Sequence, residues 1–151
     1  MKANDVEILL VEDDPADAEL TMRSLRKEGL MNKIVLARDG AEALELLFAT
    51  DVETLAHPRL VLLDLQLPRV SGHAVLKAIK GDERTRNIPV IVMTSSDHER
   101  DLAECYRLGA NSYVQKPVDL NKFQDAVKQL GNYWLMVNRT PPANAATLQT
   151  S

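Results

Sequence analysis

The stretch "PRLVLLDLQLP", residues 58–68, joins a wholly apolar run to an acidic residue. Residues 60–63 are all leucine or valine, Asp64 follows at once, and Pro68 comes four residues later. A run that is apolar at every position is typical of a strand covered on both faces, as in a parallel sheet. The carboxylate at its end has two interpretations: an ordinary polar strand end, or a nucleophile or ligand at the rim of a buried sheet. The rest of the chain is needed to decide.

Short apolar runs alternate with helical patterns along the whole sequence. We expect strands within 6–13, 33–37, 58–68, 88–94 and 111–115, and helices within 15–29, 39–49, 71–81, 97–109 and 119–138. Strands that are separated by helices predict an α/β fold with a parallel sheet and right-handed crossovers. The remaining residues, 138–151, are rich in Pro, Ala and Thr without periodicity, and we expect a disordered tail there.

Composition narrows the classes of protein that the sequence fits. The chain has 151 residues, which suggests one domain, and a formal net charge of -4 without a basic stripe, which argues against nucleic-acid binding. No apolar run approaches the roughly 20 residues that span a membrane, and the first residues lack the apolar core of a signal peptide. The single cysteine, Cys105, allows no intramolecular disulfide and is interpreted as a small apolar residue. We therefore expect a cytoplasmic protein with no membrane partner.

Polar residues stand at the carboxyl ends of four of the five predicted strands. Sites in open parallel sheets form at that edge, near the point where the strand order reverses. The residues in question are Glu12, Asp13 and Asp14 after the first strand, Asp64 after the third, Thr94 after the fourth and Lys116 after the fifth. Each has an ordinary interpretation alone, since Asp13 or Asp14 before Pro15 can cap a helix and Lys116 can be a surface lysine. Their joint occurrence at strand ends favours a shared site.

These residue types together suit phosphoryl chemistry. Clustered carboxylates raise one another's pKa, and a hard cation such as Mg²⁺, which prefers oxygen ligands, removes the conflict. Lys116 offers a positive charge, and Thr94 a hydroxyl donor, to phosphoryl oxygens. A carboxylate that is not fully occupied by metal can then attack phosphorus and form an aspartyl phosphate.

At this point the chain resembles the response-regulator receiver domains of two-component signalling, the class of the chemotaxis regulator. The resemblance covers about residues 5–137 and is carried by "LLVEDDP", "LLDLQLPRVSG", "VIVMTSS" and "YVQKPV". It implies a flavodoxin-like doubly wound (βα)5 fold with five parallel strands in the order 2-1-3-4-5. It also implies a phosphorelay protein that is no turnover enzyme, with a histidine kinase as its phosphodonor and Mg²⁺ as its cofactor.

The resemblance also assigns roles to individual residues. Four residues are implied to bind the metal: Asp13 directly, Glu12 through water, the Gln66 carbonyl, and Asp64, which is also the phosphoacceptor. The other implied roles are Thr94 as switch hydroxyl, Lys116 as partner of a phosphoryl oxygen, and Tyr113 as aromatic switch. The Lys116–Pro117 peptide is typically cis in the family. Tyr113 could otherwise be ordinary strand packing.

Two features depart from a minimal receiver. The segment "FATDVETLAHP" before the third strand is about six residues longer, and the last helix carries "NYWLMVN" with no output domain after it. Both resemble the single-domain regulators that partner bacterial phytochrome histidine kinases. Tyr133, Trp134 and Leu135 are then candidates for the face of a homodimer or for a partner contact, since aromatic clusters mark interfaces. The other interpretation is that Trp134 packs the helix end on the core.

Three other functions remain as alternatives. A phosphohydrolase that forms an aspartyl phosphate usually has a second Asp two residues after its nucleophile, and here that position is Gln66, which cannot transfer a proton. A flavin or nucleotide binder of similar topology lacks support, because neither G-x-G-x-x-G nor G-x-x-x-x-G-K-[ST] is present. A receiver-like module that is never phosphorylated is disfavoured by the complete set of acidic, hydroxyl and lysine residues. The histidines, His57, His73 and His98, do not form a site by spacing.

Overall fold

A parallel sheet of five strands in the order β2-β1-β3-β4-β5 forms the centre of the computed structural model, which describes residues 8–27, 34–51, 55–95 and 99–128. The strands are β1 (Ile8–Val11), β2 (Ile34–Ala37), β3 (Leu60–Asp64), β4 (Val90–Thr94) and β5 (Ser112–Gln115). The helices are α1 (Pro15–Lys27), α2 (Gly40–Phe48), α3 (Gly72–Gly81), α4 (Glu99–Arg107) and α5 (Leu120–Lys128). The strand order and the alternation of strands with helices confirm the predicted fold class.

The predicted elements are all present, with ends that differ by a few residues. The first strand, for example, covers Ile8–Val11 rather than all of 6–13. Gly109, with φ of 106°, stands just past the end of α4, which is a backbone conformation that glycine adopts readily. The second half of the predicted last helix, together with the predicted tail 138–151, lies outside the described residues.

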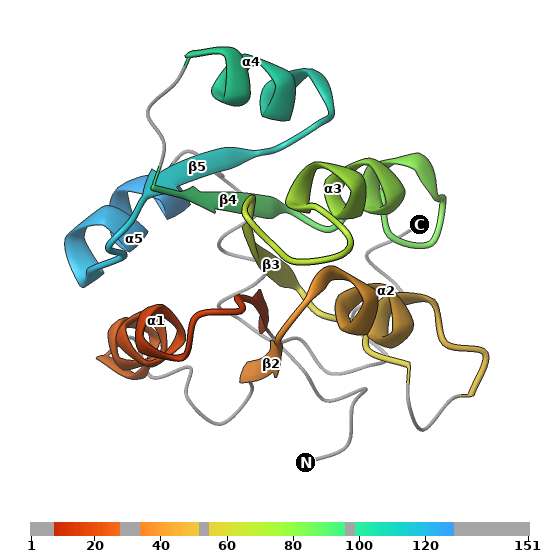
Figure 1. Cartoon of the computed structure of the whole chain (residues 1–151), viewed down its shortest axis with the longest axis horizontal. Coiled ribbons are helices and arrows are strands. Elements are labelled where there is room, and N and C mark those ends of the chain that lie inside the picture. The colour runs from red at the N-terminus through yellow and green to blue at the C-terminus, as the bar shows by residue number, and fades with distance from the viewer. Residues whose placement is uncertain (1–7, 28–33, 52–54, 96–98, 129–151) are drawn as a thin grey trace, which may run out of the picture.

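The sheet separates two apolar cores because successive residues of each strand face opposite sides. Alternate residues such as Leu10 and Leu62 pack with α1 and α5, whereas Leu9 and Leu63 pack with α2, α3 and Cys105 of α4. Figure 1 shows this arrangement, with α1 and α5 to one side of the sheet and α2 and α3 to the other. Strands β1, β3 and β4 are buried at every residue, which explains why their sequences are apolar throughout.

Short polar side chains fix where three helices begin. The carboxylate of Asp39 accepts a hydrogen bond from Glu42 N at 2.8 Å, and the Ser71 hydroxyl accepts one from Ala74 N at 3.1 Å. At the start of α1, Asp14 Oδ1 accepts from Ala16 N at 2.9 Å. The helix-capping role therefore belongs to Asp14, which leaves its neighbour Asp13 available for the site.

Lys80, near the end of α3, ties together the loops at the opposite edge of the sheet. Its ammonium donates to the carbonyl oxygens of Arg86 at 3.1 Å and Ile88 at 2.7 Å, and to Asn111 Oδ1 at 3.1 Å. The same Asn111 oxygen accepts from Val90 N at 2.9 Å. The starts of β4 and β5 are thus held in register by one partly buried ammonium and one amide.

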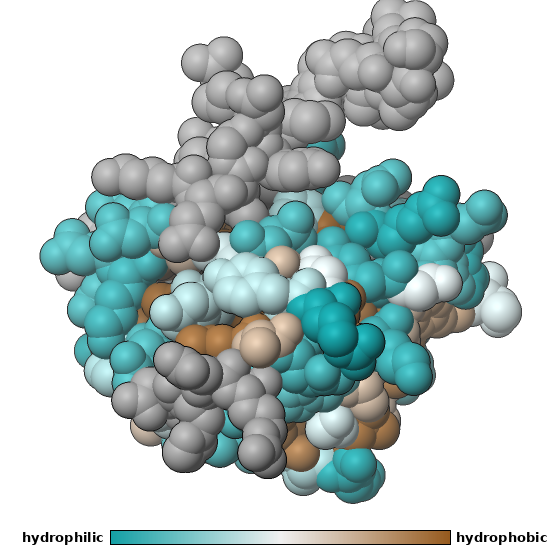
Figure 2. Space-filling view, turned by 90° about the horizontal axis from the view of Figure 1, so that it is seen from above, coloured by the Kyte–Doolittle hydropathy of each residue, from teal (hydrophilic) through white to brown (hydrophobic). Residues whose placement is uncertain are grey.

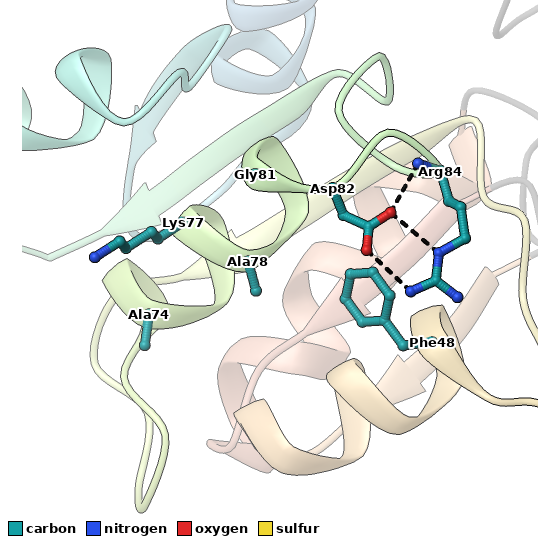
Figure 3. A pocket seen from close by; sticks show the side chains of 7 residues that line it. All are labelled: Phe48, Ala74, Lys77, Ala78, Gly81, Asp82 and Arg84. Atoms are coloured by element: carbon teal, nitrogen blue, oxygen red, sulfur yellow. Dashed lines mark hydrogen bonds and ion pairs between the residues drawn. The ribbon is translucent and has the colours of Figure 1, made fainter.

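The described surface is mostly hydrophilic. On the face shown in Figure 2, apolar residues appear only in small patches among hydrophilic ones. A hollow of about 570 Å³ lies where α2 ends beside α3, and its floor includes Phe48 and Ala78 (Figure 3). The Arg84 guanidinium lies over the Phe48 ring, 5.0 Å from its centroid, and pairs with Asp82 at 2.9 Å. In the segments that the structure describes, no helix has the length and hydropathy of a membrane span.

Gly72 brings the first turn of α3 against the end of β3. A Cβ on Gly72 would lie 2.3 Å from the Asp64 carbonyl oxygen and 2.5 Å from the Leu65 Cα, both of which are backbone atoms. The Gly72 N–H also donates to the Leu65 carbonyl oxygen at 3.1 Å. Only a residue without a side chain fits this contact, so Gly72 helps to set the position of Asp64.

This contact predicts that Gly72→Ala lowers the free energy of unfolding by about 1–3 kcal/mol, because the backbone must shift to admit the methyl group. Urea denaturation measures the change. Gly81→Ala in the last residue of the same helix is the matched control, since a Cβ there meets nothing within 4 Å. We expect the control to be as stable as wild type or more so, and equal stabilities of the two variants would contradict this account.

Candidate functional site

Three neighbouring strands bring the predicted site residues to one edge of the sheet. In the parallel register, Val11 of β1 is opposite Leu63 of β3, and Asp64 is opposite Met93 of β4. Glu12 and Asp13 follow Val11 directly, and Thr94 follows Met93. The order of the strands, with β1 and β3 adjacent, therefore places the acidic residues of two separate segments side by side.

The Lys116 ammonium lies among these acidic side chains. Its Nζ is 2.7 Å from Glu12 Oε1, 2.9 Å from Asp64 Oδ2 and 3.4 Å from Asp17 Oδ2. The side chains of Glu12 and Asp64 are buried, and that of Lys116 is only 12% exposed. Lys116 is therefore no ordinary surface lysine, and its charge compensates buried carboxylates.

The acidic side chains fit a hard divalent cation. Oxygens of Glu12, Asp13 and Asp64 all lie within 4.8 Å of one another, and Asp13 is exposed, so the cluster opens to solvent. Within the described segments, Glu12 Oε1 is the buried side-chain oxygen that lacks a hydrogen bond of regular geometry, and its short contact with Lys116 is ionic. An opening lined by carboxylate oxygens suits Mg²⁺, which keeps several of its waters.

The pKa values reflect the same crowding. Burial raises the pKa of the Glu12 carboxyl to about 7, the adjacent Asp64 adds to the rise, and Lys116 opposes it. Burial by itself lowers the pKa of Lys116, but Glu12 and Asp64 outweigh it and hold that pKa above its usual value. The lysine thus remains an ammonium, and a second cation near Glu12 would favour the ionised carboxyl.

Contacts of Asp64 and of Arg69 hold the loop after β3 in place. Gln66 N donates to Asp64 Oδ1 at 3.1 Å, so one carboxylate oxygen accepts a backbone hydrogen bond while the other contacts Lys116. Further along, Arg69 adopts a positive φ of 64° and forms an ion pair with Asp39, the residue that caps α2. The Asp64 side chain is therefore fixed by the backbone of its own loop and by the end of β5.

Thr94 and Lys116 are linked through the backbone of β4 and β5. Thr94 is buried, and its carbonyl oxygen accepts from Lys116 N at 2.8 Å. The Lys116–Pro117 peptide is cis, as the resemblance implied. The structure thus brings Thr94, Lys116 and Asp64 to the same edge.

Some predicted residues lie elsewhere. Tyr113 is 38% exposed on β5, and its ring meets that of Tyr106 edge-on, with centroids 6.2 Å apart and an interplanar angle of 84°. Tyr113 is thus partly exposed and packs against Tyr106, and both its switch role and the alternative of ordinary strand packing stay predictions. The interface candidates Tyr133, Trp134 and Leu135 lie outside the described residues, as does His98. His57 is exposed in the loop before β3.

Asp17 is a member of the site that the sequence did not reveal. It stands in the first turn of α1, where an acidic residue is common for its interaction with the helix dipole. Its position four residues after Asp13, on the helix that starts at the end of β1, was the available signal. The contact with Lys116, which is distant in sequence, could not be read from that position.

Comparison with known proteins identifies the family. The family model "Response regulator receiver domain" matches residues 8–128. The chain belongs to the response regulator receiver family. This receiver is 44% identical over 134 residues to a probable methanogenesis regulatory protein, FilR2, from Methanothrix harundinacea, covering 89% of this chain and 86% of that protein. Receivers work as phosphorylation-dependent switches, and the chain is a response regulator of that kind.

Two solved structures closely resemble this receiver. The bacteriophytochrome response regulator AtBRR has a TM-score of 0.74 and 48% sequence identity, over 83% of this chain and 92% of that chain. The phosphorylated cyanobacterial phytochrome response regulator RcpA has a TM-score of 0.73 and 36% identity, over 91% and 99% of the two chains. These two similarities confirm the predicted resemblance to phytochrome response regulators.

The contacts of Lys116 predict how Mg²⁺ affects stability. Lys116→Met removes the ammonium from two buried carboxylates, and we expect the free energy of unfolding in EDTA to fall by about 3–5 kcal/mol. Saturating Mg²⁺ should then raise the melting temperature of the variant more than that of wild type, because the cation no longer competes with the ammonium. Differential scanning calorimetry with and without Mg²⁺ measures both effects.

Lys122→Met is the control for this experiment, since Lys122 Nζ donates to the Pro117 carbonyl oxygen at 3.2 Å rather than to a carboxylate. Its response to Mg²⁺ should equal that of wild type. An equal Mg²⁺ shift for Lys116→Met and wild type would contradict the competition between ammonium and cation.

Proposed function

We propose that Asp64 is the phosphoacceptor of this receiver, that Mg²⁺ is its cofactor, and that a histidine kinase is its phosphodonor. The observation that carries the proposal is the buried Asp64 carboxylate at the end of the central strand, 2.9 Å from Lys116 and grouped with Glu12 and Asp13. A nucleophile so placed is presented by a rigid strand and is flanked by the charges that phosphoryl transfer needs.

The residues around Asp64 have complementary roles in the transfer. An oxygen of Asp64 forms a bond to phosphorus while the bond from phosphorus to the donor nitrogen breaks, and the histidine leaves with that electron pair. Lys116 and the Thr94 hydroxyl donate to phosphoryl oxygens as their charge develops. Asp13, Glu12, Asp64 and the Gln66 carbonyl oxygen would hold Mg²⁺, which neutralises negative charge on the phosphoryl group when bound.

The proposed output is a shift of the α4–β5 surface. Thr94 and Lys116 are joined by a backbone hydrogen bond, and Tyr113 lies on β5, three residues before Lys116, which directly follows that strand. Movement of Thr94 toward the phosphoryl group would give Tyr113 room to turn inward, away from its present edge contact with Tyr106. Phosphorylation then biases an equilibrium between two arrangements of this surface.

The similarity to AtBRR and RcpA supports a kinase of the bacterial phytochrome type as the donor. We further propose that the receiver spans residues 5–137, acts in the cytoplasm, binds no nucleic acid and turns over no external substrate. Gln66, two residues after Asp64, supports the last point, since an amide cannot serve as a general acid.

Phosphorylation by a small acyl phosphate tests the assignment of Asp64. With Mg²⁺ and acetyl phosphate, the wild type should gain the mass of one phosphoryl group, whereas Asp64→Asn should gain none. Lys116→Met should bind the metal and lose most of its labelling. Intact mass spectrometry reports all of these results.

Asp14→Asn is the matched control, because Asp14 caps α1 and does not belong to the carboxylate cluster. It should be labelled as wild type is. Undiminished labelling of Asp64→Asn would remove Asp64 from the proposal.

We also propose a homodimer through the face of the last helix, with Tyr133, Trp134 and Leu135 in the contact. The exposed Tyr106 and Tyr113 support an interaction surface on α4 and β5, and the described part of α5 packs beside β5. Sedimentation velocity at micromolar concentration should show a dimer that Trp134→Ala weakens and Trp134→Phe retains. A wild type that stays monomeric with and without phosphorylation would contradict the dimer.

A further inference from the structure

Asp17 gives the Lys116 ammonium a third acidic neighbour that differs from the other two. Asp17 Oδ2 lies 3.4 Å from Lys116 Nζ, farther than the oxygens of Glu12 at 2.7 Å and Asp64 at 2.9 Å. Its side chain is 36% exposed, whereas those of Glu12 and Asp64 are 0% and 3% exposed. The ammonium therefore contacts two buried carboxylates closely and a third, partly exposed carboxylate at a longer distance.

Asp17 also stands apart from the carboxylates that would hold a cation. Among the described residues, the group whose oxygens lie within 4.8 Å of one another comprises Glu12, Asp13 and Asp64, and Asp17 is not part of it. Asp17 belongs to α1, whereas Glu12 and Asp13 precede that helix at the end of β1. Its carboxylate therefore touches the ammonium from outside the carboxylate cluster.

The ammonium and a divalent cation compete for the same two carboxylates. Glu12 and Asp64 now neutralise Lys116, and both are members of the cluster that suits a cation. Two positive ions cannot share these oxygens at contact distance without strong repulsion. When the cation binds, Lys116 must therefore give up part of its contact with Glu12 and Asp64, and it needs another anion if it is to stay in the crevice.

We propose that Asp17 holds the Lys116 ammonium when a divalent cation occupies Glu12, Asp13 and Asp64, and that it thereby raises the affinity of the crevice for the cation. Asp17 is a positioning residue that acts through Lys116. The inference rests on the proposed function and adds a residue to it. Because Asp17 contacts Lys116 more closely in the cation-bound state than in the free state, its contact favours the bound state.

A double-mutant cycle on Mn²⁺ binding tests the inference. Mn²⁺ shares with Mg²⁺ a preference for carboxylate and water oxygens, and the electron paramagnetic resonance signal of the free ion gives the bound fraction directly. The four proteins are the wild type, Asp17→Asn, Lys116→Met and the double variant, at constant ionic strength. Thermal unfolding without divalent cation verifies that each one is folded.

We expect Asp17→Asn to weaken Mn²⁺ binding about two- to fivefold in the presence of Lys116, which is the range for a partly exposed ion pair. In the Lys116→Met background, Asp17→Asn removes only the direct electrostatic attraction between Asp17 and the ion. The fold-change in the Mn²⁺ dissociation constant should then be smaller than in the presence of Lys116 by a factor of about two or more. Any smaller difference between the two backgrounds would overturn the inference, because Asp17 would then act without Lys116.

Glu19→Gln is the control for the loss of one negative charge from the same helix. Glu19 lies in α1 and pairs with Arg23 at 3.4 Å on the exposed face. It should leave the Mn²⁺ titration unchanged, and a loss equal to that of Asp17→Asn would overturn the inference. Absence of Mn²⁺ binding by the wild type would contradict the metal site of the proposed function, and the inference with it. Wild-type binding with an unchanged titration for Asp17→Asn would contradict the inference alone.

Discussion

A single buried ammonium balances the charge of the crevice on which the other features of the site depend. Glu12 and Asp64 are both buried, and their oxygens lie close enough to repel each other strongly when both are ionised. The Lys116 ammonium, 2.7 Å from one and 2.9 Å from the other, offsets part of this repulsion, although burial still raises the pKa of the Glu12 carboxyl. The carboxylates are therefore contacted by an ammonium group that competes with a divalent cation for the same oxygens.

The strand order makes this balance possible. Because β1 and β3 are adjacent, acidic residues that are about 50 positions apart in the sequence meet side by side. Lys116 follows β5, the edge strand of the sheet, and the hydrogen bond from its N–H to the Thr94 carbonyl oxygen anchors it to β4. Gly72 then lets α3 approach the Asp64 backbone closely. Each of these constraints acts on the backbone next to a residue of the site, so the sheet and the loop after β3 together set how the site residues are arranged.

Much of this arrangement could be predicted from the sequence, because the signals are local. Wholly apolar runs identified the central strands, and strand ends identified Glu12, Asp13, Asp64, Thr94 and Lys116. What could not be predicted depends on contacts between distant segments. Asp14 and Asp13 were equivalent as candidate caps until the bond from Ala16 N distinguished them. The contact of Asp17 with Lys116 and the pairing of Tyr113 with Tyr106 join different elements, and no periodicity encodes them.

Strand β5 connects the site with the surface, because Lys116 directly follows the strand and Tyr113 lies exposed on it. Tyr113 alternates with buried residues along β5, so its ring lies outward while Ser112 and Val114 face the core on the other side of the sheet. Its edge contact with Tyr106 is worth about 0.5–1.5 kcal/mol in typical aromatic pairs. A tenfold change in a two-state equilibrium requires only about 1.4 kcal/mol, so gain or loss of this one contact is comparable to the energy that a signalling switch needs. In the proposed switch, the charged site controls this aromatic pair, and only the difference in free energy between the two arrangements has to be supplied.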